Sequence, residues 1–288
     1  MPTIESFAVI GGDLRFAYLA GALAADGYTV ISAGLDDAAM PPCVTGCTSV
    51  VQALASADAV ILPMPVSNDG ITLNAPFSHK RITLESLFSA VKPSQRLFGG
   101  APSEAVQQVA AAHGCVLNDY LAREELALRN AVPTAEGAVQ LALEELPVTL
   151  FGAHCLVTGY GRVAKALSEL LRAMGAHVTV AARKYADLAL AQTRGCHAVR
   201  FADMAVGGYD VIFNTVPQLV FTQEVLQQLP RETLLIDLAS RPGGVDFNAA
   251  ARLQIKTVWA LSLPGRVAPQ TAGHIIKDTV LNIITEMS

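Results

Sequence analysis

Short, continuous apolar runs alternate along the chain with longer segments in which apolar residues recur at helical spacing. The runs predict strands buried on both faces, and the intervening segments predict helices. The predicted strands of the first half are 7–11, 28–34, 59–65, 96–100 and 115–119, with alanine-rich helices at 14–26 and 103–113. Those of the second half are 154–159, 177–182, 210–216, 233–239 and 255–261. Two such series predict an α/β fold with two doubly wound, Rossmann-like domains, mainly parallel sheets and a cleft between the domains.

The segment PTAEGAVQLALEEL predicts the joint between the domains. Pro133 and Thr134 favour a helix start, so we expect a crossing helix over 133–147. Residues 268–287 form one amphipathic pattern whose apolar face needs a surface, and we expect this helix to return to the first domain. The predicted domains are therefore 1–132 with 268–288, for substrate and catalysis, and 148–267, for the dinucleotide.

The chain contains an internal repeat. Residues 7–34 align with residues 155–182 at a constant offset of 148, so that Gly11 matches Gly159 and Gly27 matches Gly175. Each copy has the order strand, glycine turn, helix, glycine, strand, which is one βαβ unit.

The second copy has the features of a phosphate-binding turn. Gly159 allows the tight turn, Gly161 lets the backbone approach a pyrophosphate, and Ala164 allows close packing of helix on strand. The N–H groups of Arg162 and Val163, at the helix start, then face the anion. A glycine turn without a ligand is the alternative.

The first copy differs where the phosphate would lie, because Asp13 matches Gly161. A side chain with a negative charge blocks and repels a pyrophosphate, so we assign the dinucleotide to the second domain alone. Asp13 and Arg15 still stand at the carboxyl end of a strand, where doubly wound folds bind ligands, and Arg15 can hold a carboxylate. Alternatively, Asp13 caps the helix and Arg15 points to water.

The end of the next strand bears on the choice of cofactor. An acid about 20 residues after the glycine turn is typical of NAD, whereas arginine suits the 2′-phosphate of NADP. Here Arg183 and Lys184 follow the strand, and 178–184 contains no acid. We therefore expect NADP, with NAD possible if both cations are merely solvated.

Two further strand ends should line the same site. One carries Asn214, Thr215, Val216 and Pro217, which we expect to contact the cofactor. The other carries Asp237, which can act as a base or bond neighbouring backbone N–H groups, and we favour the second interpretation.

Composition excludes several classes of protein. The chain is 52% hydrophobic and 16% charged, with a net charge of −5 and no basic run, so we expect no nucleic-acid partner. Without a signal peptide or an apolar stretch of about 18 residues, we expect a cytoplasmic protein that does not cross a membrane. The five cysteines fit reduced thiols, and the pair in PPCVTGC lacks the further ligands of a metal site, so we expect no metal.

Five motifs together carry a family resemblance, which runs from about residue 7 to the C-terminus. The chain resembles the A subunit of dipicolinate synthase. The motifs are GGDLR (11–15), NAVPTAEGA (130–138), GYGRVAKAL (159–167), DLASRPGGVDF (237–247) and LPGRVAPQTAG (263–273).

The resemblance implies a dehydrogenase component that acts with the flavoprotein-like B subunit of dipicolinate synthase in the mother cell of a sporulating bacterium. It implies oxidation of a dihydro- or 4-hydroxy-tetrahydro-dipicolinate from the lysine pathway to pyridine-2,6-dicarboxylate. We also expect a homo-oligomer. The alternatives are a two-domain 2-hydroxy- or amino-acid dehydrogenase, against which the missing His–acid pair argues, and a nucleotide-binding regulatory subunit without turnover.

This small dicarboxylate substrate calls for cations and N–H donors on two sides. Arg15 of the first domain and Arg241, next to Ser240 in the second, are the expected clamp. Thr134 offers a hydroxyl at a helix start, and Gly265 offers a backbone donor. Arg266 is a weaker candidate. We expect His154, at a strand start, and His274, inside the last helix, to be structural rather than parts of a His–acid pair. Glu124 and Glu125 either supply the catalytic base or belong to a solvated helix face, and the sequence favours neither interpretation. We name Glu125 and Asp237 as the catalytic candidates.

Overall fold

The computed structural model describes residues 4–287 of the chain. Two compact units divide it: unit 1 holds the residues up to Asn130 together with those from Ala268 onward, and unit 2 is Ala131–Val267. Among the described residues, no helix is both long enough and apolar enough to span a membrane.

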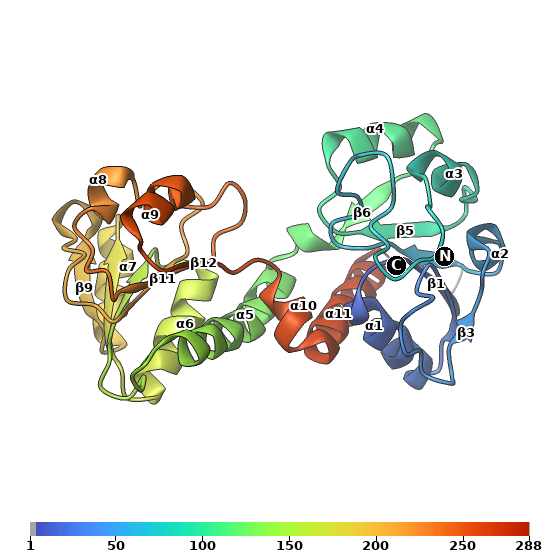
Figure 1. The fold of residues 1–288 in the computed structure, drawn as a ribbon. Helices are drawn as coiled ribbons and strands as arrows, with labels where there is room; N and C mark the ends of the chain where they lie inside the picture. Colours follow the sequence, from blue (N-terminus) through green and yellow to red (C-terminus); the bar gives the residue numbers. More distant parts are fainter. Residues whose placement is uncertain (1–3, 288) are drawn as a thin grey trace. The chain divides into compact units, whose positions relative to one another are not determined.

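Each unit is built on a six-stranded sheet in which all strand pairs are parallel (Figure 1). The strand order of unit 1 is β3-β2-β1-β4-β5-β6, and that of unit 2 is β9-β8-β7-β10-β11-β12. The two orders are equivalent, which confirms the predicted α/β fold of two doubly wound units and extends the sequence repeat to whole sheets.

Unit 1 has hydrophobic clusters on both faces of its sheet, one under α1 and α11 and one under α2, α3 and α4. Its elements are β1 (Ser6–Ile10), α1 (Leu14–Ala25), β2 (Thr29–Ala33), β3 (Thr45–Gly46), α2 (Val50–Ala55), β4 (Ala59–Ile61), α3 (Leu84–Ser89), β5 (Arg96–Gly99), α4 (Glu104–Ala112), β6 (Leu117–Asp119), the 3₁₀ turn η1 (Tyr120–Ala122) and α11 (Pro269–Glu286).

Unit 2 is layered in the same way, with α6 and α7 over one cluster and α8 and α9 over the other. Its elements are β7 (His154–Thr158), α6 (Arg162–Ala173), β8 (His177–Ala182), α7 (Tyr185–Thr193), β9 (His197–Arg200), the 3₁₀ turn η2 (Phe201–Asp203), β10 (Val211–Asn214), α8 (Gln223–Leu226), β11 (Leu234–Asp237), α9 (Phe247–Leu253), β12 (Thr257–Trp259) and α10 (Leu263–Val267).

The helix that links the units corrects one prediction. Helix α5 spans Glu124–Glu145, so it begins nine residues before Pro133, which lies inside it. The interior proline costs the helix one bond, to the carbonyl of Arg129, and strains that turn. Burial of an apolar stripe that includes Leu126, Ala131 and Ala142 on both sides of the proline outweighs this cost.

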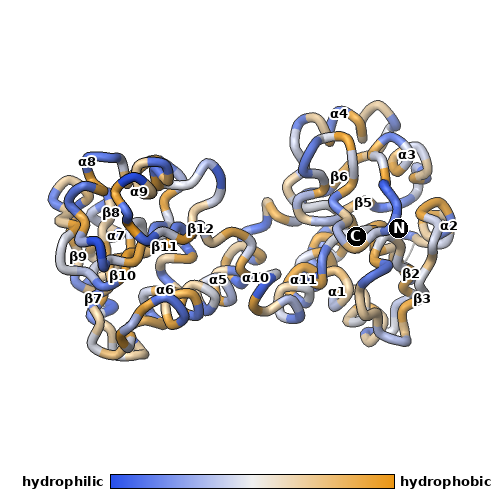
Figure 2. The backbone as a smooth tube through the Cα atoms, in the orientation of Figure 1, coloured by the Kyte–Doolittle hydropathy of each residue, from blue (hydrophilic) through white to orange (hydrophobic). Residues whose placement is uncertain are grey.

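Helix α11 belongs to unit 1 and lies beside α1 (Figure 1). Hydrophobic residues alternate with polar ones along it (Figure 2), and Ile275, Ile276 and Val280 are buried in the cluster that holds Phe16 of α1. The closest approach is at Gly273, where an added Cβ would lie 2.4 Å from the carbonyl oxygen of Arg15. A hydrogen atom at this position therefore lets α11 cover the helix that carries Arg15.

We predict that Gly273→Ala destabilises the protein by about 1–3 kcal/mol, because α1 must move to admit the methyl group. Alanine raises helix propensity by up to about 1 kcal/mol, which works in the opposite direction. Urea unfolding followed by circular dichroism measures the net change in the free energy of unfolding. Gly46→Ala is the control, because a Cβ there meets nothing within 4 Å. A Gly273→Ala protein as stable as the wild type would contradict the close approach.

Candidate functional site

The glycine turn after β7 is held by backbone geometry. Gly159 has φ +87°, and an added Cβ would lie 2.6 Å from Oγ1 of Thr215. The N–H of Gly159 donates to the carbonyl of Ala181 on β8 at 2.8 Å, and Thr215 Oγ1 donates to the carbonyl of Thr158 at 2.8 Å. The turn is thus tied to the tips of both neighbouring strands, and only glycine fits it.

Helix α6 begins directly after this turn without a side-chain cap. Gly161 is its N-cap residue and has no side chain to cap the helix, and nothing lies within 4 Å of where a Cβ would stand. Arg162 and Val163 form the first turn. The backbone N–H groups of this turn and the positive end of the helix dipole lie beside that space, so this helix start can accept a pyrophosphate.

In unit 1, the side chain of Asp13 occupies the corresponding helix start. Asp13 caps α1 by accepting the N–H of Arg15 at 3.1 Å. The same carboxylate accepts Arg15 Nε at 2.9 Å and Nη2 at 2.7 Å. An acceptor with a full negative charge already occupies the place that a phosphate would take, so the turn of unit 1 is closed to a pyrophosphate.

Arg15 is buried, with 6% of its surface exposed. Its Nη2 also donates to the carbonyl of Met64 at 3.2 Å. The alternative for this turn therefore holds in part: Asp13 caps α1, but Arg15 does not point to water, because Asp13 in the same turn neutralises the guanidinium and allows its burial. Tyr120 lies near this pair and donates its hydroxyl proton to the carbonyl of Leu62, and burial raises the pKa of Tyr120 well above its usual value.

A buried polar network joins the tips of β7, β10 and β11 at the carboxyl edge of the unit 2 sheet. Asn214 accepts the hydroxyl proton of Thr158 at 2.7 Å and donates to Asp237 Oδ1 at 2.7 Å and to the carbonyl of Val216 at 3.0 Å. Thr158, Asn214 and Asp237 have no exposed surface. The network therefore fixes the loop of residues 215–217 relative to the three strands.

Asp237 also organises the loop that follows β11. Its Oδ1 accepts the N–H of Ala239 at 3.1 Å and its Oδ2 that of Gly244 at 2.8 Å. Three donors thus occupy the two oxygens of a fully buried carboxylate, the arrangement that the sequence analysis favoured over a base. In the same loop, Ser240 and Arg241 are exposed, and the Arg241 guanidinium carbon lies 5.4 Å from the centre of the Trp259 ring.

A hollow of about 330 Å³ opens beside the end of β8. Arg183 stands at its edge, and most of the remaining wall is apolar, including Val216 from the loop after β10. No carboxylate among residues 4–287 forms an ion pair with the exposed Arg183, and Lys184 follows as the N-cap of α7. The other lining residues are Phe201, Met204, Val206, Gln218, Leu219, Val220, Val225 and Gln228.

Of the residues that line this hollow, only Arg183 and Val216 were predicted from the sequence as site residues. Its walls come from loops after β9 and β10 and from α8, segments that carry no ligand motif. The one available signal was that two apolar residues, Leu219 and Val220, follow shortly after the strand-ending Pro217.

Other predicted site residues lie in different surroundings. Thr134 is half-buried ten residues inside α5, so the expectation that it stands at a helix start was wrong. Glu125 is in the first turn of α5 and accepts Arg123 Nε at 2.8 Å. Its own N–H and the Arg123 guanidinium hold the pKa of Glu125 below its usual value, which makes it a weaker base. Gly265 lies within α10 rather than in an open turn.

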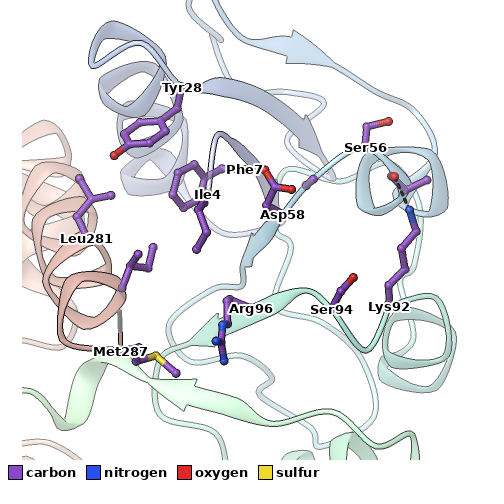
Figure 3. A pocket seen from close by; sticks show the side chains of 13 residues that line it. Ile4, Phe7, Tyr28, Ser56, Asp58, Lys92, Ser94, Arg96, Leu281 and Met287 are labelled. Atoms are coloured by element: carbon purple, nitrogen blue, oxygen red, sulfur yellow. Dashed lines mark hydrogen bonds between the residues drawn. The ribbon is translucent and has the colours of Figure 1, made fainter. Parts of the chain in front are cut away.

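A hollow of about 820 Å³ lies in unit 1 at the amino ends of β1, β4 and β5 (Figure 3). Its polar groups bond the chain itself: Asp58 accepts the Ser6 hydroxyl at 2.6 Å, and Lys92 Nζ donates to the carbonyl of Ala55 at 2.6 Å. These bonds join strand starts and α2. Ligands of doubly wound folds bind at the opposite, carboxyl edge, so we place the candidate site there.

The fold and this site define an α/β protein of two Rossmann-like units with a dinucleotide-binding turn in the second. Residues 6–121 match the family described as the N-terminal domain of the dipicolinate synthase A subunit, and residues 146–251 match a family described as putative NAD(P)-binding.

Known proteins extend these matches. The crystal structure of the dipicolinate synthase A subunit from Bacillus halodurans superposes with a TM-score of 0.89 at 31% identity, covering 97% of each chain. The dipicolinate synthase A subunit of Bacillus subtilis (strain 168) is 34% identical over 193 residues, which are 66% of this chain and 65% of that protein. D-lactate dehydrogenase from Escherichia coli shares the fold, with a TM-score of 0.60 at 13% identity.

The chain belongs to the family of dipicolinate synthase A subunits. Membership of this family and the match of residues 146–251 to an NAD(P)-binding family together support a dehydrogenase-type subunit that uses a nicotinamide cofactor.

We predict that Asp237→Asn destabilises unit 2 by about 1.5–3 kcal/mol, because an amide cannot replace a charged acceptor for three donors. The cofactor should bind less tightly as well, since the loop of residues 215–217 loses its anchor. Thermal unfolding and fluorescence titration with NADPH measure the two effects. The exposed Asp203→Asn is the control. A stable Asp237→Asn protein that binds NADPH normally but has lost turnover would instead support Asp237 as a base.

Proposed function

We propose that this chain is the dehydrogenase subunit of a dipicolinate synthase. It oxidises a dihydro- or 4-hydroxy-tetrahydro-dipicolinate to pyridine-2,6-dicarboxylate, and NADP⁺ accepts the hydride. The observation that carries the proposal is the uncapped start of α6 behind the Gly159 turn, in a chain of this family. Asp13 already caps the start of α1, which supports a cofactor site in unit 2 alone.

The residues present fit a dinucleotide. Gly161, with the N–H groups of Arg162 and Val163, would hold the pyrophosphate, and the apolar hollow would take the adenine ring. Arg183 and Lys184 would hold a 2′-phosphate, since a guanidinium beside a second cation favours a dianion over a ribose hydroxyl. Loop residues Thr215, Val216 and Pro217 would contact the cofactor, and the buried Asn214 would fix their position through its bond to Asp237 rather than touch the cofactor itself.

The proposed substrate carries two carboxylates, each of which calls for a cation or a hydrogen-bond donor. Arg241 is exposed and partly oriented by Trp259, and Ser240 precedes it with an exposed side chain. Arg15 has its Nε and Nη2 engaged by Asp13 and Met64, so Nη1 is the group that would meet a carboxylate. Thr134 would contribute its hydroxyl alone, and Gly265 its N–H.

The proposed chemistry needs little help from an acid or base. The 4-hydroxy-tetrahydro form must first lose its 4-hydroxyl as water, which gives the dihydropyridine. Oxidation of this dihydropyridine ring removes a hydride and a proton and creates an aromatic product, so positioning contributes most of the catalysis. Asp237 and Glu125 already accept hydrogen bonds from other residues of the protein, which agrees with a small contribution from acid–base catalysis. We propose in addition that the dipicolinate synthase B subunit is the partner and that the protein works in the cytoplasm of a sporulating mother cell.

We predict that the wild-type protein binds NADPH more tightly than NADH and that Arg183→Asp reverses this order. The change in relative affinity should be about tenfold or more, because it replaces attraction of the 2′-phosphate by repulsion. Fluorescence titrations of both nucleotides test it, with the exposed Arg231→Ala as control. Equal affinities of the wild-type protein for NADPH and NADH would refute the role of Arg183.

A turnover assay tests the reaction itself. The purified chain with fresh 4-hydroxy-tetrahydrodipicolinate and NADP⁺ should produce absorbance at 340 nm together with pyridine absorbance. Signal only after addition of the B subunit would mean an obligate complex. Nucleotide binding without turnover, even with that partner present, would favour a regulatory subunit, and turnover of 2-hydroxy or amino acids alone would favour the alternative dehydrogenase.

A further inference from the structure

Unit 1 has its own hollow at the carboxyl edge of its sheet, with a volume of about 290 Å³. It occupies the same topological position as the hollow of about 330 Å³ in unit 2. Each lies at the end of the second strand of its repeat, next to the loops after the third and fourth strands and a following helix. In unit 1 the lining residues are Gly34, Asp36, Thr48, Ser49, Val50, Val51, Ser78, Lys80, Arg81, Ile82 and Ser86.

The chemistry of the two hollows differs. Asp36 stands two residues beyond Gly34 at the end of β2, the place where doubly wound folds carry the acid that accepts ribose hydroxyls. The equivalent residue in unit 2, at the offset of 148, is Lys184. Unit 1 therefore has an acceptor for hydroxyl groups where unit 2 has a cation.

Asp36 is held in place by the loop between β4 and α3. Its Oδ2 accepts the N–H of His79 at 2.8 Å, and the Ser78 hydroxyl donates to the carbonyl of Lys80 at 2.8 Å. Oδ1 of Asp36 accepts no hydrogen bond from residues 4–287 and is left for a ligand. The same loop thus orients the acid and brings the cationic residues to the hollow.

The hollow has both cationic and apolar lining residues. Lys80 and Arg81 are exposed cations, and the hydroxyl-bearing Thr48, Ser49 and Ser86 also line it. Val50, Val51 and Ile82 are its apolar lining residues. An acid for hydroxyls, two cations and an apolar wall correspond to the sugar, phosphate and base of a nucleotide.

The turn after β1 limits the length of that nucleotide. Asp13 and Arg15 close the start of α1, so the pyrophosphate of a dinucleotide has no place there. We propose that the hollow of unit 1 binds a nucleoside monophosphate: Asp36 accepts the ribose hydroxyls, Lys80 and Arg81 hold the phosphate, and the base lies against Val50, Val51 and Ile82. This second nucleotide site is independent of the dinucleotide turn in unit 2.

Calorimetric titration of the full chain with AMP tests the proposal. Asp36→Asn and Arg81→Gln should each weaken AMP binding about tenfold, because each removes a charged hydrogen-bonding group. Leu219→Asp, in the hollow of unit 2, should abolish any AMP binding there and leave AMP binding in unit 1 intact, whereas the exposed Arg231→Gln should change neither. Adenosine and inorganic phosphate, titrated separately, should each bind more weakly than AMP.

Several results would overturn the proposal. The first is the absence of any heat of binding with millimolar AMP. The second is loss of AMP binding in Leu219→Asp while Asp36→Asn retains it. The third is an equal affinity for AMP and for either inorganic phosphate or adenosine. NADPH titrations of the same variants keep the two sites distinguishable. Failure of NADPH to bind, with AMP bound as expected, would contradict the proposed cofactor site while leaving the hollow of unit 1 supported.

Discussion

The N–H groups at the start of a helix need an acceptor, and the two units meet this need in opposite ways. In unit 1 the carboxylate of Asp13 accepts an N–H of α1 and binds the buried guanidinium of Arg15. In unit 2 the equivalent residue is Gly161, which has no side chain that could act as an acceptor for α6. Two βαβ copies that share strand order and turn position thereby become different sites, one closed by the chain and one open to an anion.

The open site is supported by a polar network that has no contact with water. Asn214 links Thr158 on β7 to Asp237 on β11, and Asp237 in turn binds two N–H groups of the loop after its strand. Gly244 must lack a side chain, because a Cβ would lie 2.2 Å from Asn214 Nδ2. The tips of three strands are therefore held in one fixed arrangement beside the start of α6.

Periodicity predicted the fold well where apolar runs are long and buried on both faces. It missed β3, which has two residues, and β9, whose sequence HAVR lacks an apolar run, because both are edge strands that packing does not cover fully. It also began the linking helix at Pro133, since proline is a local signal for a helix start. Helix α5 begins at Glu124 because apolar residues on both sides of the proline are buried, Leu126 in a cluster of unit 1 and Ala142 in a cluster of unit 2.

The sequence by itself determined the repeat, the glycine turn of unit 2 and the replacement of its partner glycine by Asp13. These depend on residues close together in the chain, whose backbone freedom and charge act locally. Only the tertiary structure decided that Arg15 is buried by Asp13, that Asp237 is an acceptor for a loop, and that residues from the ends of separate strands enclose a hollow in each unit. Those outcomes depend on which strand tips become neighbours in the sheet, and hydrogen bonds such as Asn214 to Asp237 join groups 23 residues apart that no local pattern relates.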